Sequence, residues 1–588
     1  MRPHYSHTVL ISLLTITCSR PQPVAPPPVP DPVAVLPPVQ VAPPAPSLEA
    51  ILRGLTVREQ IGQLIIPWII GSYSAADGEG LAELREAVDS FAVGGIIVSV
   101  GSPLDVAAKL NALQRRSRLP LLIASDLEWG TGMRLLGGTA FPMPMALGAT
   151  GRPDDAYAMG RITALEARAV GIHLTFSPVA DVNSNPLNPI INTRSFGEDP
   201  DAVGRLLSAY IRGAEEHGLR TTAKHFPGHG DTGTDSHIAV PVVAGCWDRL
   251  DSLELRPFRA AIAAGVTAVM TAHVVMSCLD GPDPLPATLS SGVMRGILRD
   301  SLRFEGLVVT DALTMGAIIE RFGPGETAVR AFEAGSDLLL MPADLRAAVD
   351  SMHAAVSSGR ITRARLESSV RRVLSLKRDL GLFQRRIVPL DSVMSTVGRH
   401  AFQDVADDIA RLALTLVQRG PIDSIRATRG GVALIAYAEE TNLGFGTQLT
   451  RELRLLGDTV SMFRLYPASG TASYDSARAV IAASPRVLFA SSVRPIAARG
   501  HVALPDSLAQ LIVTTSRRRS SVLASLGSPY LLAQVPGYRG AYLIGWSANL
   551  ATERAVARAL AGGAPITGHL PITLGPETPA GSGIQIPE

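Results

Sequence analysis

The sequence predicts an α/β protein, with a (β/α)8 TIM-like barrel followed by an α/β sandwich domain. At 588 residues the chain is too long for one hydrophobic core, because single cores stop growing near roughly 250–300 residues. Between residues 47 and 385 short apolar runs alternate with helix-like stretches, the pattern of repeated βα units. A second series of such runs fills residues 411–588 and is typical of an open α/β domain.

The N-terminal residues have the order of a secretory signal peptide. Arg2 and two histidines precede the apolar run Val9–Ile16, and Cys18 follows this run. The run is too short to cross a bilayer, which takes about 20 residues. We expect residues 1–20 to direct export to the periplasm or cell envelope, and Cys18 is a candidate site for a lipid anchor.

Residues 21–46 are dominated by proline, valine and alanine. Such a segment favours extended polyproline II and acts as a semi-rigid spacer. It predicts a linker that holds the catalytic part away from a membrane, and the alternative is a tail with no role. The other cysteines, Cys246 and Cys278, indicate no disulfide framework, although one bridge between them stays open.

The composition is that of an ordinary globular enzyme, with 46% hydrophobic and 18% charged residues. The net charge of +2 gives no electrostatic reason to expect a nucleic-acid partner.

Eight apolar runs are the candidate strands of the barrel. They span residues 63–69, 95–100, 120–125, 173–177, 220–223, 267–271, 306–310 and 337–340. A barrel places its active site at the carboxyl ends of its strands. Charged or titratable residues follow several of these runs, namely Asp126, Glu128, Asp181, Arg194, Lys224, His225, His273 and Asp311. We therefore expect these side chains to converge on one site.

The stretch 221–241, T-T-A-K-H-F-P-G-H-G-D-T-G-T-D-S-H-I-A-V-P, is unusually rich in titratable residues and glycine. Such a loop is costly to fold unless it lines a site. The spacing of His225 and His229 suits zinc, but the intervening F-P-G prevents the continuous helix that would put both on one face. We expect no metal and no organic cofactor.

Asp235 and His237 lie two residues apart, so a tight turn could bring the carboxylate to one imidazole nitrogen. This contact would fix the tautomer of His237 and make it a proton shuttle near neutral pH. Alternatively, Asp235 only accepts backbone hydrogen bonds in its loop. Asp311 follows an apolar run and could serve as a nucleophile at an anomeric carbon. Its alternative role is the N-cap of a helix over residues 312–319.

Residues 386–410 are expected to link the two domains. In the second domain, strand-like runs include V-A-L-I-A-Y, R-V-L-F-A-S-S, L-I-V-T-T-S and A-Y-L-I-G-W. Helix-like stretches cover residues 442–456 and 552–560.

Several motifs resemble glycoside hydrolase family 3, and specifically its β-N-acetylglucosaminidase branch. The central ones are K-H-F-P-G-H-G-D-T-G-T-D-S-H, S-P-V-A-D-V-N-S-N-P and R-S-F-G-E-D-P. The blocks A-S-D-L-E-W-G, V-M-T-A-H-V, V-V-T-D-A-L-T-M and E-A-G-S-D-L-L-L-M match further family blocks in order. The likeness covers residues 50–385.

The resemblance implies roles for nine residues of this chain. Asp311 would be the nucleophile, His237 the general acid/base and Asp235 the residue that orients His237. The sugar-binding residues would be Asp126, Arg134, Arg194, Lys224 and His225. Asp181 would have a structural role. One departure is that relatives often read D-x-E-G-G-R where this chain reads D-L-E-W-G-T-G-M-R, which shifts the arginine to Arg134 and places Trp129 in the loop.

The resemblance thus implies an exported retaining β-N-acetylhexosaminidase that removes terminal β-linked N-acetylglucosamine from peptidoglycan fragments or chito-oligosaccharides. The alternatives are a β-glucosidase or β-xylosidase of the same family, or a glycoside phosphorylase. From another class, the chain could be a non-catalytic lipoprotein that binds the cell wall. The second domain is expected to lie beside the barrel mouth without supplying the acid/base.

Overall fold

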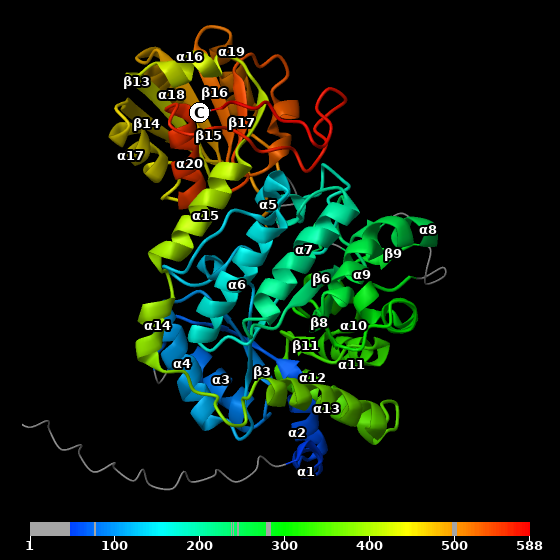
Figure 1. Cartoon of the computed structure of the whole chain (residues 1–588). Helices are drawn as coiled ribbons and strands as arrows, with labels where there is room; N and C mark the ends of the chain where they lie inside the picture. Colours follow the sequence, from blue (N-terminus) through cyan, green and yellow to red (C-terminus); the bar gives the residue numbers. More distant parts are fainter. Residues whose placement is uncertain are drawn as a thin grey trace, which may run out of the picture. The chain divides into compact units, whose positions relative to one another are not determined.

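The computed structural model describes residues 47–75, 78–236, 238, 240–243, 246–277, 284–496 and 502–587 (Figure 1). The signal peptide, the lipid-anchor site at Cys18, the proline-rich linker and the acid/base candidate His237 lie outside these residues, as does Cys278. Within the described part of the chain, no helix has the length and apolar character needed to span a membrane.

The first half of the chain is a mixed α/β unit with parallel sheets. Its strands are β1 (Ile65–Ile66), β2 (Trp68–Ile70), β3 (Gly95–Ser99), β4 (Leu122–Ser125), β5 (Leu174–Thr175), β6 (Thr222–Phe226), β7 (Val242–Val243), β8 (Ala268–Thr271), β9 (Val275–Met276), β10 (Leu307–Val309) and β11 (Leu339–Leu340). A strand lies within or overlaps each of the eight runs predicted from the sequence.

These strands pair in parallel in several sheets. One sheet has the order β2-β3-β4-β5, a second has β10-β8-β6, and β1 pairs with β11. Isolated parallel bridges join Leu174 to Arg220 and Val309 to Leu338. The short pair β7 and β9 forms a separate ladder. Residues of β3 and β4 are buried throughout, as expected for parallel strands covered on both faces.

Helices separate the strands (Figure 1), and most of them share one large hydrophobic core with the strands. They are α1 (Leu48–Arg53), α2 (Val57–Gly62), α3 (Glu79–Asp89), α4 (Pro103–Arg116), α5 (Pro144–Thr150), α6 (Pro153–Ala169), α7 (Pro200–Glu215), α8 (Trp247–Arg249), α9 (Leu255–Ala263), α10 (Gly316–Phe322), α11 (Pro324–Ala334), α12 (Leu345–Ser357), α13 (Arg363–Asp379), α14 (Leu390–Thr396) and α15 (His400–Ala413).

Two of these helices begin with the same local device, a capping side chain followed by proline. Ser102 accepts a hydrogen bond from the backbone N–H of Asp105 at the start of α4, and Asp199 accepts one from the backbone N–H of Ala202 at the start of α7. The proline after each cap has no N–H to satisfy and already holds a helical φ. These signals explain why the two helices begin where they do.

The second half holds a six-stranded sheet with the order β12-β17-β16-β15-β13-β14. Its strands are β12 (Thr415–Gln418), β13 (Gly431–Tyr437), β14 (Thr459–Leu465), β15 (Arg486–Ser491), β16 (Ser520–Ser525) and β17 (Ala541–Ile544). Only β12 is antiparallel to its neighbour. The helices are α16 (Ile422–Ala427), α17 (Thr447–Leu455), α18 (Thr471–Ala482), α19 (Asp506–Ser516) and α20 (Leu550–Leu560). Two hydrophobic clusters fill the space around this sheet.

One prediction from the sequence is wrong. The run L-I-V-T-T-S, expected as a strand, belongs to α19, where Leu508, Leu511 and Ile512 lie on one buried face. The strand is the more polar β16, which a search for apolar runs misses. The alternative role of Asp311, as a helix N-cap, does not apply, since α10 begins at Gly316.

The two halves contact each other through specific hydrogen bonds. Glu198 of the first half accepts hydrogen bonds from the backbone N–H and the hydroxyl of Thr573, at 2.7 and 2.6 Å. The side-chain amide of Asn183 donates to the hydroxyl of Tyr530 at 2.8 Å. These bonds bring the second half next to the loops that follow β5.

Candidate active site

A cavity of about 410 Å³ opens at the carboxyl ends of β4 and β6 and beside the loop after β10. Its charged lining residues are Asp126, Glu128, Arg134, Arg194, Lys224, Asp311 and Arg494. The remaining lining residues are Trp129, Met133, Met143, Ile190, His225, His229, Ser236, Ala312, Pro495 and Ile496. Six of the eight site residues predicted from the sequence therefore meet in one cavity.

A chain of ion pairs forms one wall of the cavity. Lys224 on β6 lies between two carboxylates, with its Nζ 3.1 Å from Asp126 Oδ1 and 2.7 Å from Glu128 Oε1. Arg194 holds Glu128 with two parallel hydrogen bonds of 2.9 and 2.8 Å. Arg134 donates to the other oxygen of Asp126 at 2.9 Å. Each carboxylate thus contacts two cations, which fixes the position of all five side chains.

The ion pairs keep these buried groups charged. Burial by itself would raise the pKa of Asp126 and Glu128, but the adjacent cations outweigh it. Lys224 and Arg134 lower the pKa of Asp126, while Arg194 and Lys224 hold that of Glu128 well below its usual value. The two carboxylates in turn raise the pKa of Lys224 against the effect of its burial. A fixed set of charged donors and acceptors suits the hydroxyl groups of a ligand.

Asp181 organises the loop that follows β6. Its carboxylate accepts a hydrogen bond from His225 Nδ1 at 2.7 Å and another from the backbone N–H of His229 at 2.7 Å. Asp181 is buried and does not line the cavity, so it supports the two histidines that do. This is the structural role that its motif implied.

Asp311 lines the same cavity, just after β10. Its Oδ1 accepts a hydrogen bond from the backbone N–H of Ala312 at 2.7 Å. The ring of His273 donates from Nε2 to the carbonyl oxygen of Ala312 at 3.0 Å, which holds this turn. Burial would raise the pKa of Asp311, but His273, His225, the Ala312 N–H and Lys224 lower it to about 2. The carboxylate is ionised at neutral pH, as a nucleophile must be.

The predicted acid/base pair is described only in part. Asp235 is buried and precedes Ser236, whose hydroxyl lies 3.0 Å from His229 Nε2. The other ring nitrogen of His229 lies 2.7 Å from the hydroxyl of Thr232. Burial, reinforced by His225, lowers the pKa of His229 to about 4, so this ring is neutral at neutral pH. His237, the proposed partner of Asp235, lies outside the described residues.

The sequence did not assign a role to several residues of the cavity. Glu128 forms ion pairs with two cations. The sequence indicated it only as a second carboxylate, near Asp126, after the strand β4. Trp129 also lines the cavity, although it lies in the altered loop, and so does Arg134, to which the resemblance assigned a sugar-binding role. No pattern in the sequence pointed to Arg494, because it comes from the segment after β15, in the other half of the chain.

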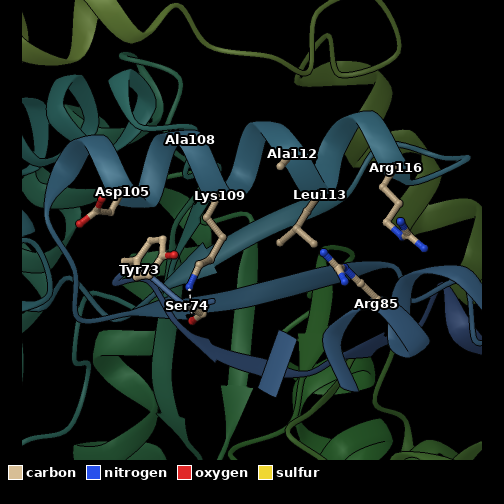
Figure 2. Close-up of a pocket in the computed structure, with 9 residues that line it drawn as sticks. All are labelled: Tyr73, Ser74, Arg85, Asp105, Ala108, Lys109, Ala112, Leu113 and Arg116. Carbon is tan, nitrogen blue, oxygen red and sulfur yellow. Dashed lines mark hydrogen bonds between the residues drawn. The ribbon is translucent and has the colours of Figure 1, made fainter. Parts of the chain in front are cut away.

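A second cavity, of about 350 Å³, lies between α4 and the segment after β2 (Figure 2). Lys109 points toward Ser74 in this view and donates to its hydroxyl at 3.0 Å and to the carbonyl oxygen of Ile70 at 2.9 Å. Arg116 at its edge forms an ion pair with Asp89. Because these cations already have partners, we do not place the chemistry here.

No group of three or more histidine, cysteine or acidic side chains that could hold a metal ion occurs among the described residues. His225 and His229, the pair whose spacing suggested zinc, have an edge-to-face ring contact and separate hydrogen-bond partners.

Comparison with known proteins places this geometry among carbohydrate-active enzymes. The family model described as "Glycosyl hydrolase family 3 N terminal domain" matches residues 56–376. The chain is 33% identical over 371 residues to a beta-N-acetylglucosaminidase/beta-glucosidase of Cellulomonas fimi. That alignment covers 62% of this chain and 64% of the relative, so about a third of the relative lies outside the aligned region.

Solved structures match over a larger part of the chain. A glycoside hydrolase family 3 beta-N-acetylglucosaminidase from Paenibacillus sp. aligns with a TM-score of 0.80 and 34% identity, covering 88% of this chain and 99% of that one. A beta-glucoside phosphorylase aligns with a TM-score of 0.79 and 26% identity, covering 90% and 96% of the two chains.

Proposed function

This chain belongs to glycosyl hydrolase family 3, and from that premise we propose that it is a retaining β-N-acetylhexosaminidase. The proposed reaction is hydrolysis of terminal β-linked N-acetylglucosamine from peptidoglycan fragments or chito-oligosaccharides. The observation that carries the proposal is the ionised carboxylate of Asp311, which faces the same cavity as the ion-paired wall of Asp126, Glu128, Arg194 and Lys224.

The first chemical step uses Asp311 as nucleophile. Its carboxylate attacks the anomeric carbon, the glycosidic bond breaks, and His237 gives its proton to the departing oxygen. The product is a glycosyl ester on Asp311 together with the free leaving group. The lowered pKa of Asp311 supports this role, because an unprotonated carboxylate is available across the neutral range.

The second step releases the sugar. His237, now neutral, takes a proton from water, and the water oxygen attacks the anomeric carbon. The bond between this carbon and Asp311 breaks, which regenerates the carboxylate of Asp311 and gives net retention. Asp235 would orient His237 and stabilise its charged form. The buried position of Asp235, directly beside a residue that lines the cavity, supports this pairing.

The non-reducing sugar would lie against the charged wall. Asp126, Arg134, Arg194, Lys224 and His225 would hold its hydroxyl groups, and Glu128 would keep the two central cations in place. The fixed ion pairs favour this arrangement because they need no reorganisation when the sugar binds.

We interpret the parallel sheets of the first half as an eight-stranded (β/α)8 barrel, with β1 and β2 as one strand interrupted at Pro67. Two isolated bridges support closure, because one links β5 to the segment before β6 and the other links β10 to the segment before β11. The pairing of β11 with β1 supports the last contact of the ring.

We propose that the enzyme is exported and acts in the periplasm or cell envelope, with Cys18 as its lipid-anchor site. The apolar run before Cys18 supports this localisation. Cys246 forms a disulfide bond, which also favours an oxidising compartment.

Initial rates on 4-nitrophenyl β-N-acetylglucosaminide and β-glucoside test the proposal. Wild type should prefer the first substrate, and Asp311→Ala should lose at least about a thousandfold in kcat because the covalent step is removed. The exposed carboxylate Asp105 provides a control, since Asp105→Asn alters only the second cavity. A preference for the glucoside would instead assign a β-glucosidase, and binding of wall glycan without turnover would assign a non-catalytic lipoprotein.

A glycoside phosphorylase is the second candidate, favoured by the structural likeness to a beta-glucoside phosphorylase. A neutral imidazole as acid/base repels an incoming phosphate less than a second carboxylate would. Product analysis with and without phosphate distinguishes the two, because a phosphorylase releases the sugar 1-phosphate.

A further inference from the structure

Arg494 connects the candidate active site to a second hollow in the C-terminal half. This hollow has a volume of about 390 Å³ and is lined by residues that include Tyr437, Glu439 and Ser492. Arg494 and Ile496 line both cavities. A ligand that extends out of the active site toward this hollow would therefore pass the guanidinium of Arg494.

The second hollow occupies a place in its sheet where ligands are generally bound. Strand β13 is the first parallel strand of this six-stranded sheet, with β14 on one side and β15 on the other, so the strand order reverses there. The hollow is lined by residues that follow β13, β14 and β15, at their carboxyl ends. Open α/β sheets bind ligands in the crevice at such a switch point.

The charged residues that line the active site include one more cation than carboxylates. Three carboxylates, Asp126, Glu128 and Asp311, face three other cations, Arg134, Arg194 and Lys224. Each of these three cations forms an ion pair with Asp126 or Glu128. Arg494 is a fourth cation and leaves the lining with a net positive charge.

Arg494 also differs from these cations in its surroundings. The residue as a whole is exposed, although partial burial of its guanidinium lowers the pKa of Arg494 and the carboxylate of Glu439 opposes this shift. Within the described part of the chain, Arg494 forms no ion pair with a carboxylate. An arginine keeps its charge at all physiological pH values and presents paired donors that fit a carboxylate or a phosphate.

We propose that Arg494 is a specificity-determining residue that binds an anionic group on the far side of the cleaved bond. This proposal rests on the proposed glycosidase function and adds to it the charge of the ligand. The anionic group is a carboxylate on the leaving group or a phosphate ion that accepts the sugar. Both would bind the same guanidinium, and the experiment separates them.

The test compares two substrates whose coumarin leaving groups differ only at position 4, 4-methylumbelliferyl β-N-acetylglucosaminide and its analogue with a 4-carboxymethyl group. Wild type should have a higher kcat/KM for the carboxylate substrate, and Arg494→Ala should reduce the ratio of the two values about tenfold, the effect of one charge-assisted hydrogen bond. Arg494→Lys keeps the charge and should retain part of the preference. Arg518→Ala, at an exposed arginine in the turn after α19, is the matched control and should keep the ratio of the wild type.

A second arm measures sugar 1-phosphate formed from the neutral substrate at increasing phosphate concentration. If phosphate is the anion, Arg494→Ala should raise the phosphate concentration needed for half-maximal formation about tenfold, while the substrate ratio stays constant. A substrate ratio and a phosphate response that are both unchanged in folded Arg494→Ala would overturn the proposal. Failure of the wild type to cleave either N-acetylglucosaminide would instead refute the proposed function.

Discussion

Glu128 is the residue whose replacement should damage the site most through electrostatics alone. It is buried and binds Arg194 with two hydrogen bonds and Lys224 with an ion pair. The change Glu128→Gln keeps the size of the side chain and removes its charge. Lys224 would keep Asp126 as a partner, whereas Arg194 would lose the carboxylate that it contacts.

The expected cost of Glu128→Gln is about 3 kcal/mol in the free energy of unfolding, the lower end for breaking a buried ion pair. The lower end applies because Arg194 retains some exposure and still donates to the carbonyl oxygen of Ile190. Urea denaturation of wild type, Glu128→Gln and the double variant Glu128→Gln with Arg194→Gln measures the loss. The double variant should recover part of it, since the uncompensated cation is gone.

The pH dependence of this loss gives an independent check. The pKa of Glu128 is lowered in the folded protein, so its contribution to stability is present above its ordinary pKa. This contribution is lost as the pH falls through the lowered folded value. The stability difference between wild type and Glu128→Gln should therefore shrink in acid. A loss below about 1 kcal/mol at pH 7, or one that does not shrink in acid, would refute the reasoning.

Three further variants test other parts of the structure. Lys377 is buried against Gln63, and burial lowers the pKa of Lys377 to about 7. Denaturation experiments should therefore show that the stability of the wild type rises between pH 7 and 10 and that Lys377→Met abolishes this rise. An equal rise in both proteins would contradict the prediction. Arg134→Ala should raise KM about tenfold with little change in kcat, because Lys224 still holds Asp126; a fall in kcat alone would place Arg134 in the chemical step. His237→Ala should slow substrates with poor leaving groups by at least about a hundredfold and 2,4-dinitrophenyl substrates far less; equal losses on both would exclude general acid catalysis by this residue.

Local patterns in the sequence were sufficient for much of the fold and part of the site. The apolar run before Asp126 predicted a buried strand, and the strand end placed this carboxylate in the cavity. The motif that begins within β6 likewise predicted that Lys224 and His225 would face the same space. Such residues are predictable because each lies at or just beyond the carboxyl end of its own strand.

Other features depend on contacts that no local pattern encodes. The run L-I-V-T-T-S is β-branched and apolar, yet it is helical because its buried residues also fit one face of α19. Arg494 enters the cavity only because the second half of the chain lies against the loops after β5. The role of Glu128 arises from two cations far away in the sequence, so its importance becomes visible only when the three residues are brought together.

Mass spectrometry of a trapped intermediate tests the central claim most directly. A 5-fluoro-N-acetylglucosaminyl fluoride should form a covalent intermediate that turns over slowly, because fluorine destabilises the oxocarbenium-like transition states. We expect the sugar on the peptide that contains Asp311 in wild type, and no adduct in Asp311→Asn. A stable adduct on another residue, or full turnover by Asp311→Asn, would contradict the assignment of Asp311 as the nucleophile.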